Sequence, residues 1–156
     1  MKKKQTKPRN ATIENRKARH EYHIGETFEA GIVLVGTEVK SIRIGKASLN
    51  ESYCRFEDGE LWIVGMYVAP YEQGSRYNVE TTRPRKLLLH KAELDKIHKG
   101  LEEKGYTLVP LKLYFTRGFA KLTVALARGK KLWDKREAIA GRDIERERRR
   151  EEAGRY

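Results

Sequence analysis

The chain has 156 residues, of which 34 are lysine or arginine and 22 are aspartate or glutamate, giving a formal net charge of +12 at pH 7. This length allows one domain with a substantial core and leaves little room for a second. No apolar run approaches the ~20 residues that span a bilayer, and the single cysteine, Cys54, excludes an internal disulfide framework. We therefore expect a cytoplasmic protein that does not enter the membrane.

The positive charge is concentrated at the two ends of the chain. Residues 1–20 contain eight lysines or arginines and one acid, and residues 127–156 contain eleven and seven, whereas the body between them holds fifteen and fourteen. Residues 1–14 are rich in lysine, poor in apolar side chains and interrupted by Pro8, which predicts a flexible arm. The body is composed like an ordinary globular domain.

The first predicted strand is followed by a short helix. Residues 27–35 are rich in β-branched and apolar side chains and predict a mostly buried strand that ends at Gly36. Thr37 is expected to cap the helix, with Glu38 in its first turn and Gly45 as its C-terminal stop.

A hairpin and an irregular stretch come next. Residues 49–56 and 61–68 predict two antiparallel strands, because the Asp58-Gly59 pair between them favours a tight turn. Residues 69–84 contain two prolines, one glycine and Asn78, which predict a surface loop, a place where a partner could bind.

The last part of the body predicts an amphipathic helix and a second pair of strands. Residues 91–104 place apolar side chains on one face and end before Gly105, and residues 106–115 and 119–127 are strand-like. Five or six sequential strands with two helices predict a mainly β fold, an antiparallel barrel of the oligonucleotide-binding (OB) type. A β-sandwich is the alternative.

The residues with chemically reactive side chains do not form a familiar catalytic or metal-binding pattern. The four histidines are His20, His23, His90 and His98, and only the first two are close in sequence. There is no His-Glu-x-x-His motif, no Gly-x-Ser-x-Gly turn and no second cysteine that could join Cys54 as a zinc ligand. We expect no metal, no cofactor and no enzymatic activity, although a catalytic site assembled in space remains an alternative.

The C-terminal residues become segregated by charge when they are wound as a helix. At about 100° per residue, one arc of roughly 100° collects seven basic side chains, and the opposite face collects three acidic ones. The basic residues are Arg128, Lys131, Lys135, Arg142, Arg146, Arg149 and Arg150, and the acidic ones are Glu137, Glu147 and Glu151. Such a stripe suits a phosphate surface, and Trp133 beside it offers a plane on which an unpaired base can stack. The alternatives are a solvated charged face and a packed tryptophan.

Five segments resemble, in this order, motifs of the bacterial small protein B family, whose members are also called SsrA-binding proteins. They are residues 15–22 (NRKARHEY), 36–41 (GTEVKS), 85–89 (RKLLL), 126–131 (LARGKK) and 134–137 (DKRE), and the likeness covers about residues 8–143. The resemblance implies an OB-type barrel that binds transfer-messenger RNA (tmRNA, or SsrA RNA) at its transfer-RNA-like end. It also implies delivery of that RNA to stalled ribosomes, the process called trans-translation, by a monomeric adaptor.

The resemblance also assigns residues to partners. Eight residues are expected on the RNA-binding side of the barrel: Asn15, His20, Tyr22, Glu29, Leu88, Lys121, Leu126 and Ala127. Ten are expected to contact small-subunit ribosomal RNA at the decoding centre and the message channel: Arg128, Lys130, Lys131, Trp133, Asp134, Lys135, Arg136, Arg142, Arg146 and Arg149.

The implied organisation has three parts. They are the arm (residues 1–14), an OB-fold RNA-binding domain (residues 15–132) and a charged tail (residues 133–156) that becomes helical in an empty message channel. The family commonly has tyrosine or histidine where Trp133 stands; stacking survives this change, but an accepted hydrogen bond does not, because indole only donates. The rival function is a general single-strand RNA binder with polybasic arms.

Overall fold

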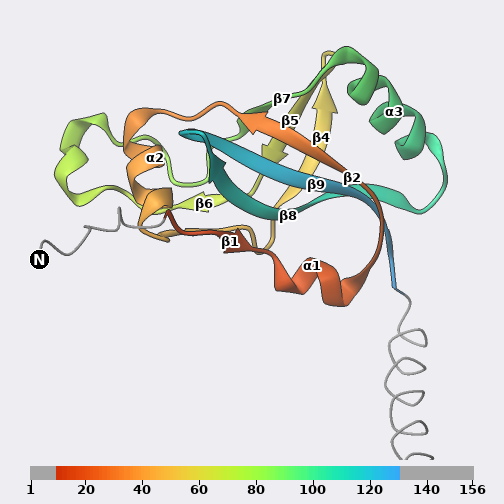
Figure 1. The fold of residues 1–156 in the computed structure, drawn as a ribbon, viewed down its shortest axis with the longest axis horizontal. Helices are drawn as coiled ribbons and strands as arrows, with labels where there is room; N and C mark the ends of the chain where they lie inside the picture. Colours follow the sequence, from red (N-terminus) through yellow and green to blue (C-terminus); the bar gives the residue numbers. More distant parts are fainter. Residues whose placement is uncertain (1–9, 131–156) are drawn as a thin grey trace, which may run out of the picture.

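The computed structural model describes residues 10–130, which form a β-barrel with helices around it (Figure 1). The described strands are β1 (Ile13–Glu14), β2 (Tyr22–Ile32), β3 (Ala47–Ser48), β4 (Tyr53–Glu57), β5 (Glu60–Val64), β6 (Tyr67–Val68), β7 (Arg85–Leu88), β8 (Tyr106–Thr116) and β9 (Phe119–Gly129). The described helices are α1 (Arg16–Glu21), α2 (Gly36–Arg43) and α3 (Lys91–Glu102), with a 3₁₀ helix, η1 (Glu72–Tyr77), in the loop before β7.

Six strands close the barrel. The main sheet has the order β1-β8-β4-β5-β7-β2-β9. An additional pairing between β8 and β9 closes the last six of these strands into a ring, and the short β1 pairs with β8 outside that ring. Every pairing is antiparallel, and the β8–β9 ladder is the longest, running from Tyr106 opposite Arg128 to Thr116 opposite Phe119. A sheet that closes on itself has no long free edge. The predicted antiparallel barrel with flanking helices is therefore confirmed, and the sandwich is not found.

The barrel interior holds the main core. Leu108, Leu113, Leu122 and Val124 are fully buried there. A second, smaller cluster lies on the outer face of β8 and β9, where Val109, Leu111, Ala125 and Ala127 pack against Ala18 of α1. Because both faces of these strands are covered, their sequences read as nearly continuous apolar runs and not as a clean alternation.

The predicted amphipathic helix is confirmed as α3. Ile97 is fully buried, Leu94 and Leu101 pack against the core, and Gly105 follows the helix with a φ of 88°. Figure 1 shows α2 and α3 at opposite ends of the barrel, with α1 beside β8. The three helices thus leave much of the barrel wall uncovered.

The predicted turn at Asp58-Gly59 is confirmed, and a second tight turn joins β8 to β9. In the β4–β5 hairpin, Asp58 and Gly59 have φ values of 52° and 76°, which a two-residue turn of this handedness requires. Between β8 and β9, Arg117 and Gly118 adopt φ values of 51° and 82°.

Two predicted boundaries were wrong. Strand β2 begins at Tyr22 and ends at Ile32, earlier than the predicted residues 27–35. Helix α2 is preceded by Val35, whose N–H donates to Glu38 Oε1 at 3.1 Å, so Thr37 is not the cap. Its hydroxyl instead donates to the backbone oxygen of Tyr77 at 3.4 Å.

The N-terminal segment differs from the predicted arm at its end. Ile13 is 9% exposed and pairs with Leu113, so residues 13–14 belong to the barrel, and α1 follows at Arg16. Helix α1 was not predicted, because a six-residue helix with only Ala18 buried shows no apolar period. Residues 1–9 lie outside the described part.

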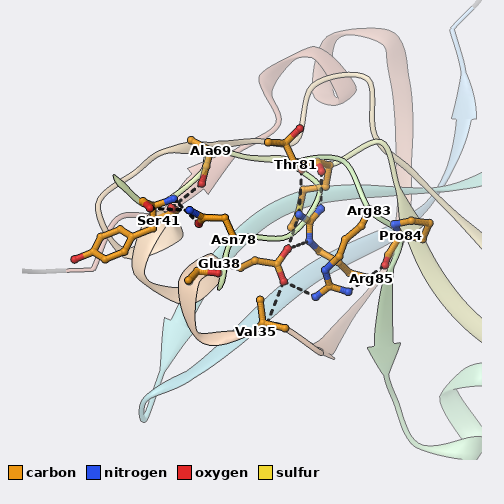
Figure 2. Close-up of polar contacts among 12 residues, drawn as sticks. Val35, Glu38, Ser41, Ala69, Asn78, Thr81, Arg83, Pro84 and Arg85 are labelled. Atoms are coloured by element: carbon orange, nitrogen blue, oxygen red, sulfur yellow. Dashed lines mark hydrogen bonds and ion pairs between the residues drawn. The ribbon is translucent and has the colours of Figure 1, made fainter. Parts of the chain in front are cut away.

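A buried ionic network fixes α2 against the barrel (Figure 2). Glu38 is 3% exposed and Arg85 is fully buried; Arg85 Nε donates to Glu38 Oε2 at 2.6 Å, and Arg83 Nη2 donates to Glu38 Oε1. Arg85 also donates to the backbone oxygens of Met66 and Thr81. Burial opposes ionisation of Glu38, but the hydrogen bonds from Arg83 and Val35 and the charge of Arg85 together lower the pKa of that carboxyl.

Candidate nucleic-acid interface

The outer wall of the barrel presents two rows of side chains across neighbouring strands. In the first row the paired positions are Leu88 (β7), Gly31 (β2), Lys121 (β9) and Tyr114 (β8). The second row places Glu29 (β2), Thr123 (β9) and Lys112 (β8) side by side. Residues that pair across strands point to the same face, so these side chains share one surface.

Three of the predicted RNA-binding residues meet at a hollow in this wall. Glu29, Leu88 and Lys121 line an open cavity of about 400 Å³, together with Phe119 from the turn between β8 and β9. Leu88 is 52% exposed and Phe119 is 69% exposed. We call the site formed by Glu29, Leu88, Phe119 and Lys121 the hollow. It combines two exposed apolar side chains with one lysine and one carboxylate, and His90 and a second carboxylate, Glu93, line the same cavity from the start of α3.

The shape of the hollow depends on a glycine. A Cβ atom at Gly31 would lie 3.4 Å from Leu88 Cβ and 3.8 Å from Leu88 Cδ1. The Leu88 side chain therefore lies across the position that a larger residue would occupy on β2.

The tyrosine of the first row lies next to the glutamate of the second. Burial raises the pKa of the Tyr114 phenol, the hydrogen bond with Thr123 lowers it, and the neighbouring Glu29 carboxylate raises it further. Lys112 Nζ lies 5.0 Å from the centre of the Tyr114 ring, which is within cation–π range. This part of the wall therefore offers a neutral phenol beside one carboxylate and one cation.

The other predicted residues gather at the far end of the same strand pair. Tyr22 pairs with Gly129, and Gly31 with Lys121, so nine residues of β2 separate the two ends, about 25–30 Å along an extended strand. We call the group Asn15, His20, Tyr22, Arg128 and Lys130 the exit region. The structure thus divides the predicted set into two sites.

Within the exit region, Asn15 has an internal role. It is 4% exposed; its Oδ1 accepts the N–H of Ala18, and its Nδ2 donates to the backbone oxygen of Pro110 at 2.8 Å. Asn15 therefore caps α1 and fastens it to β8, because the side-chain oxygen satisfies a free N–H of the first turn.

Histidine 20 and Tyr22 differ in exposure. His20 is exposed, whereas Tyr22 is half-buried against the small cluster beneath α1. A second hollow of about 210 Å³ lies beside them, lined by Tyr22, Tyr53 and Lys17, among others. His20 is thus presented to a partner directly, and Tyr22 by one edge.

Leu126 and Ala127 do not present their side chains to solvent. Leu126 is 8% exposed and points into the main core, and Ala127 is fully buried under α1. Their side chains offer almost no surface to a partner, and the expected RNA contact of these two residues stays a prediction. They position the strand that leads to Arg128.

The described chain leaves the barrel at the exit region. Arg128 is exposed and lies 6.0 Å from the centre of the Tyr106 ring, and the N–H of Lys130 donates to the backbone oxygen of Glu21 at 2.8 Å. The other predicted ribosome-contacting residues lie outside the described part: Lys131, Trp133, Asp134, Lys135, Arg136, Arg142, Arg146 and Arg149.

Two surface residues of the wall were missed from the sequence. Neither Phe119 nor Tyr114 was singled out from the sequence as a site residue, yet Phe119 is largely exposed and Tyr114 stands in the outer row. The position of Phe119 directly after Gly118 was the available signal, since a side chain at the end of a tight turn has little to pack against.

Residues 10–130 show neither a metal-binding cluster nor a membrane-spanning helix. Within that range, no group of three or more His, Cys, Asp and Glu residues could hold a metal ion. In the same part of the chain, no helix is long and apolar enough to cross a bilayer.

The chain is similar to proteins of one kind. Residues 12–153 match the family model described as "SmpB protein". The SsrA-binding protein of Desulforudis audaxviator is 57% identical over 140 residues, covering 90% of this chain and 92% of that protein. The SsrA-binding protein of Carboxydothermus hydrogenoformans is 58% identical over 134 residues, covering 86% and 90% respectively.

A solved structure is also similar. One chain of the structure described as "tmRNA-SmpB: a journey to the center of the bacterial ribosome" shares 57% identity and superposes with a TM-score of 0.68. The match covers 82% of this chain and 94% of that one. With a family match and relatives that extend over most of its length, this chain belongs to the SmpB protein family.

Proposed function

We propose that this protein binds the transfer-RNA-like part of tmRNA through the hollow and delivers it to stalled ribosomes for trans-translation. The observation that carries the proposal is the convergence of Glu29, Leu88 and Lys121, which come from three different strands, on one open cavity. The relatives named SsrA-binding protein and the tmRNA-SmpB structure support this choice of RNA.

The side chains of the hollow suit a folded RNA surface. Lys121 provides a cation for a phosphate, and Leu88 and Phe119 provide apolar area for a base or a sugar face. A bare carboxylate repels phosphates, so Glu29 serves specificity by accepting hydrogen bonds from base amino or sugar hydroxyl groups. Recognition by shape and by such donors favours one folded RNA over any single strand.

The exit region serves the ribosome. Arg128 and Lys130 begin a basic segment whose remaining residues, 131–156, carry the helical stripe derived from the sequence. Ordering that segment costs roughly 1–2 kcal/mol per residue in backbone entropy, so it folds only where phosphates offset the cost. A message channel already filled by RNA excludes it. The tail thereby senses an empty channel in the small subunit, and its contacts reach the decoding centre.

The proposed activity is positional and not catalytic. Residues 10–130 offer surfaces that bind and orient, and the Cys54 thiol is buried, which raises its pKa far above the usual range. A buried thiol of this kind does not serve as a nucleophile. We place the protein in the cytoplasm with the ribosome.

Two variants test the division of labour. Glu29→Arg should weaken binding of the tRNA-like RNA strongly, because it removes an acceptor and reverses a charge at the hollow. Truncation after Lys131 should leave that binding intact and abolish tagging of chains on stalled ribosomes. Glu103→Arg, an exposed glutamate after α3, is the matched control for charge. Loss of RNA affinity on truncation would contradict the division.

A competition experiment separates the proposal from a general single-strand binder. The protein is bound to labelled tmRNA at physiological salt and challenged with an excess of unstructured RNA of the same length. The proposal expects the unstructured RNA to displace little of the labelled tmRNA. Displacement as complete as that by unlabelled tmRNA would show a general binder.

A further inference from the structure

Helix α2 has two faces of opposite character. Glu38, Ser41 and Ile42 are buried against the barrel. At about 100° per residue, Lys40 and Arg43 lie on the opposite side of the helix, and both are exposed. Lys46, just after the helix, is exposed as well. We call Lys40, Arg43 and Lys46 the α2 face.

The buried side of α2 is fastened at several points. The network of Glu38 with Arg83 and Arg85 holds its first turn, and Ser41 Oγ donates to the backbone oxygen of Ala69 at 2.7 Å (Figure 2). The N–H of Ala69 in turn donates to the backbone oxygen of Lys46 at 2.9 Å. The α2 face therefore projects from a rigid base.

Two of its cations rest on aromatic rings. Lys40 Nζ lies 5.4 Å from the centre of the Tyr71 ring, and the Arg43 guanidinium lies 5.4 Å from the centre of the Phe115 ring. Tyr71 is itself held by Asn78, with hydrogen bonds of 2.9 Å to its backbone N–H and oxygen. A cation already restrained over a ring loses less rotamer freedom when it binds an anion.

The local charge is positive and only partly compensated. Within the described residues, Lys46 has one acidic neighbour, Glu72, at 4.0 Å, and the carboxylate side chain of Glu72 is 88% exposed. No ion pair of Lys40 or Arg43 with an acid is found in residues 10–130. Three exposed cations beside one solvent-exposed carboxylate give a surface that attracts phosphate.

The α2 face adjoins the hollow through one strand pair. Phe115, on which Arg43 rests, pairs with Ala120, and Ala120 lines the hollow between Phe119 and Lys121. The side chains of Phe115 and Ala120 point to the opposite face of the strand pair from Lys121, so an RNA seated in the hollow reaches Arg43 by passing over the tip of the β8–β9 hairpin.

We propose that the α2 face is a second contact for the phosphate backbone of the same RNA that occupies the hollow. This inference rests on the proposed function, and it names the sugar-phosphate backbone of the transfer-RNA-like RNA as the group bound. The hollow reads bases and sugars, whereas the α2 face supplies orientation and attraction without sequence preference. Together they define a footprint that extends from the barrel wall onto the helix at its end.

The test compares two triple variants that remove the same charge. In the first, Lys40→Gln, Arg43→Gln and Lys46→Gln neutralise the α2 face. In the second, Lys96→Gln, Lys99→Gln and Lys104→Gln neutralise exposed lysines on and after α3. The affinity of each full-length protein for the transfer-RNA-like part of tmRNA is measured over a range of salt concentrations, and a thermal melt verifies folding.

The α2 triple variant should lose roughly tenfold or more in affinity at physiological salt. Its slope of log affinity against log salt should fall by about 2, since each phosphate contact contributes about 0.7–0.9. The α3 triple variant should keep the slope of the unmodified protein. Equal slopes for both triple variants would overturn the proposal. So would an α2 triple variant that binds the RNA normally and loses affinity only for the small ribosomal subunit or for a protein partner.

A third variant keeps the two proposals distinguishable. Leu88→Asp disrupts the hollow and leaves the α2 face untouched. If Leu88→Asp abolishes binding while the α2 triple variant matches its α3 control, the proposed function stands and the second contact fails. If Leu88→Asp binds normally, the hollow itself is wrong, whatever the α2 variant does.

Discussion

The hollow and the exit region lie at opposite ends of the β2–β9 strand pair, and they use their residues in different ways. In the hollow, Leu88 and Phe119 are exposed on a rigid wall and are free to bind a partner. In the exit region, Asn15 is buried and committed to capping α1, and Ala127 is fully buried beneath that helix. Residues selected by the same family resemblance are thus exposed in one place and serve as internal supports in another. Only the structure distinguishes the two.

The largest expected effect is the loss of RNA binding in Leu88→Asp. A carboxylate in place of an apolar side chain at the centre of the hollow repels phosphate and removes buried area, which costs about 2–4 kcal/mol of binding, or roughly 30- to 1,000-fold. Thermal stability should barely change, because Leu88 is 52% exposed. A filter-binding titration measures the affinity for the RNA, and a thermal melt measures the stability. Tyr67→Asp, at a residue that is 42% exposed, is the control and should bind normally.

The next effect is a loss of stability in Asn15→Ala. If this variant loses RNA affinity instead, the contrast between the hollow and the exit region fails. Asn15→Ala removes the α1 cap and leaves the Pro110 oxygen without its donor, so the free energy of unfolding should fall by about 2–3 kcal/mol. Denaturant unfolding measures this change. Asn50→Ala, at an exposed position, should stay within about 0.5 kcal/mol. A stable Asn15→Ala protein with weakened RNA binding would show that Asn15 is a contact residue.

A smaller effect is expected at the rim of the hollow. Phe119→Ala removes an exposed ring on which a base can stack, which is worth about 1–3 kcal/mol, and Phe119→Trp should retain it. The same titration should show a loss of about tenfold for alanine and little for tryptophan. Tyr67→Ala serves as the control. If both Phe119 variants bind equally, the ring has no stacking partner.

The smallest effect concerns alkaline pH. Burial and the neighbouring Glu29 carboxylate raise the pKa of Tyr114 above that of a free phenol, so the folded state favours the neutral phenol. That preference supports the fold below about pH 10 and is lost as the pH rises through the folded-state pKa. The free energy of unfolding, measured between about pH 9 and 11, should therefore fall slightly more with rising pH in the unmodified protein than in Tyr114→Phe. Identical profiles would mean that Glu29 and burial do not act on this phenol.

Much of the fold could be predicted from local signals. The Asp58-Gly59 turn and the helix ending before Gly105 follow from residues that few other conformations accept. Helix α1 could not be predicted, since its sequence is almost entirely polar and its stability comes from the Asn15 cap and one buried alanine. The closure of the barrel rests partly on a single paired position, Cys54 opposite Leu108, which no local pattern encodes.

The site was only partly accessible from the sequence. Glu29, Leu88 and Lys121 were selected through the family resemblance, because nothing in their separate surroundings predicts that three strands bring them together. Ala127 is buried by the packing of α1 on the outside of β9, a helix that was itself not predicted, whereas Leu126 is buried in the main core inside the barrel. The depth of these two side chains depends on tertiary packing, which no local pattern in the sequence encodes.

The hydrogen bond from the N–H of Lys130 to the oxygen of Glu21 has a geometric meaning. It fixes the point from which the following residues depart, about 25–30 Å from the hollow along the same pair of strands. The barrel thus sets the distance between the two proposed binding sites, the hollow and the exit region. Once one of them is bound, the other is presented at a high effective concentration to a partner at that distance. Lengthening β2 and β9 by two residues each would keep both attachments intact and separate them by a further 7 Å or about that, which would spoil their simultaneous use.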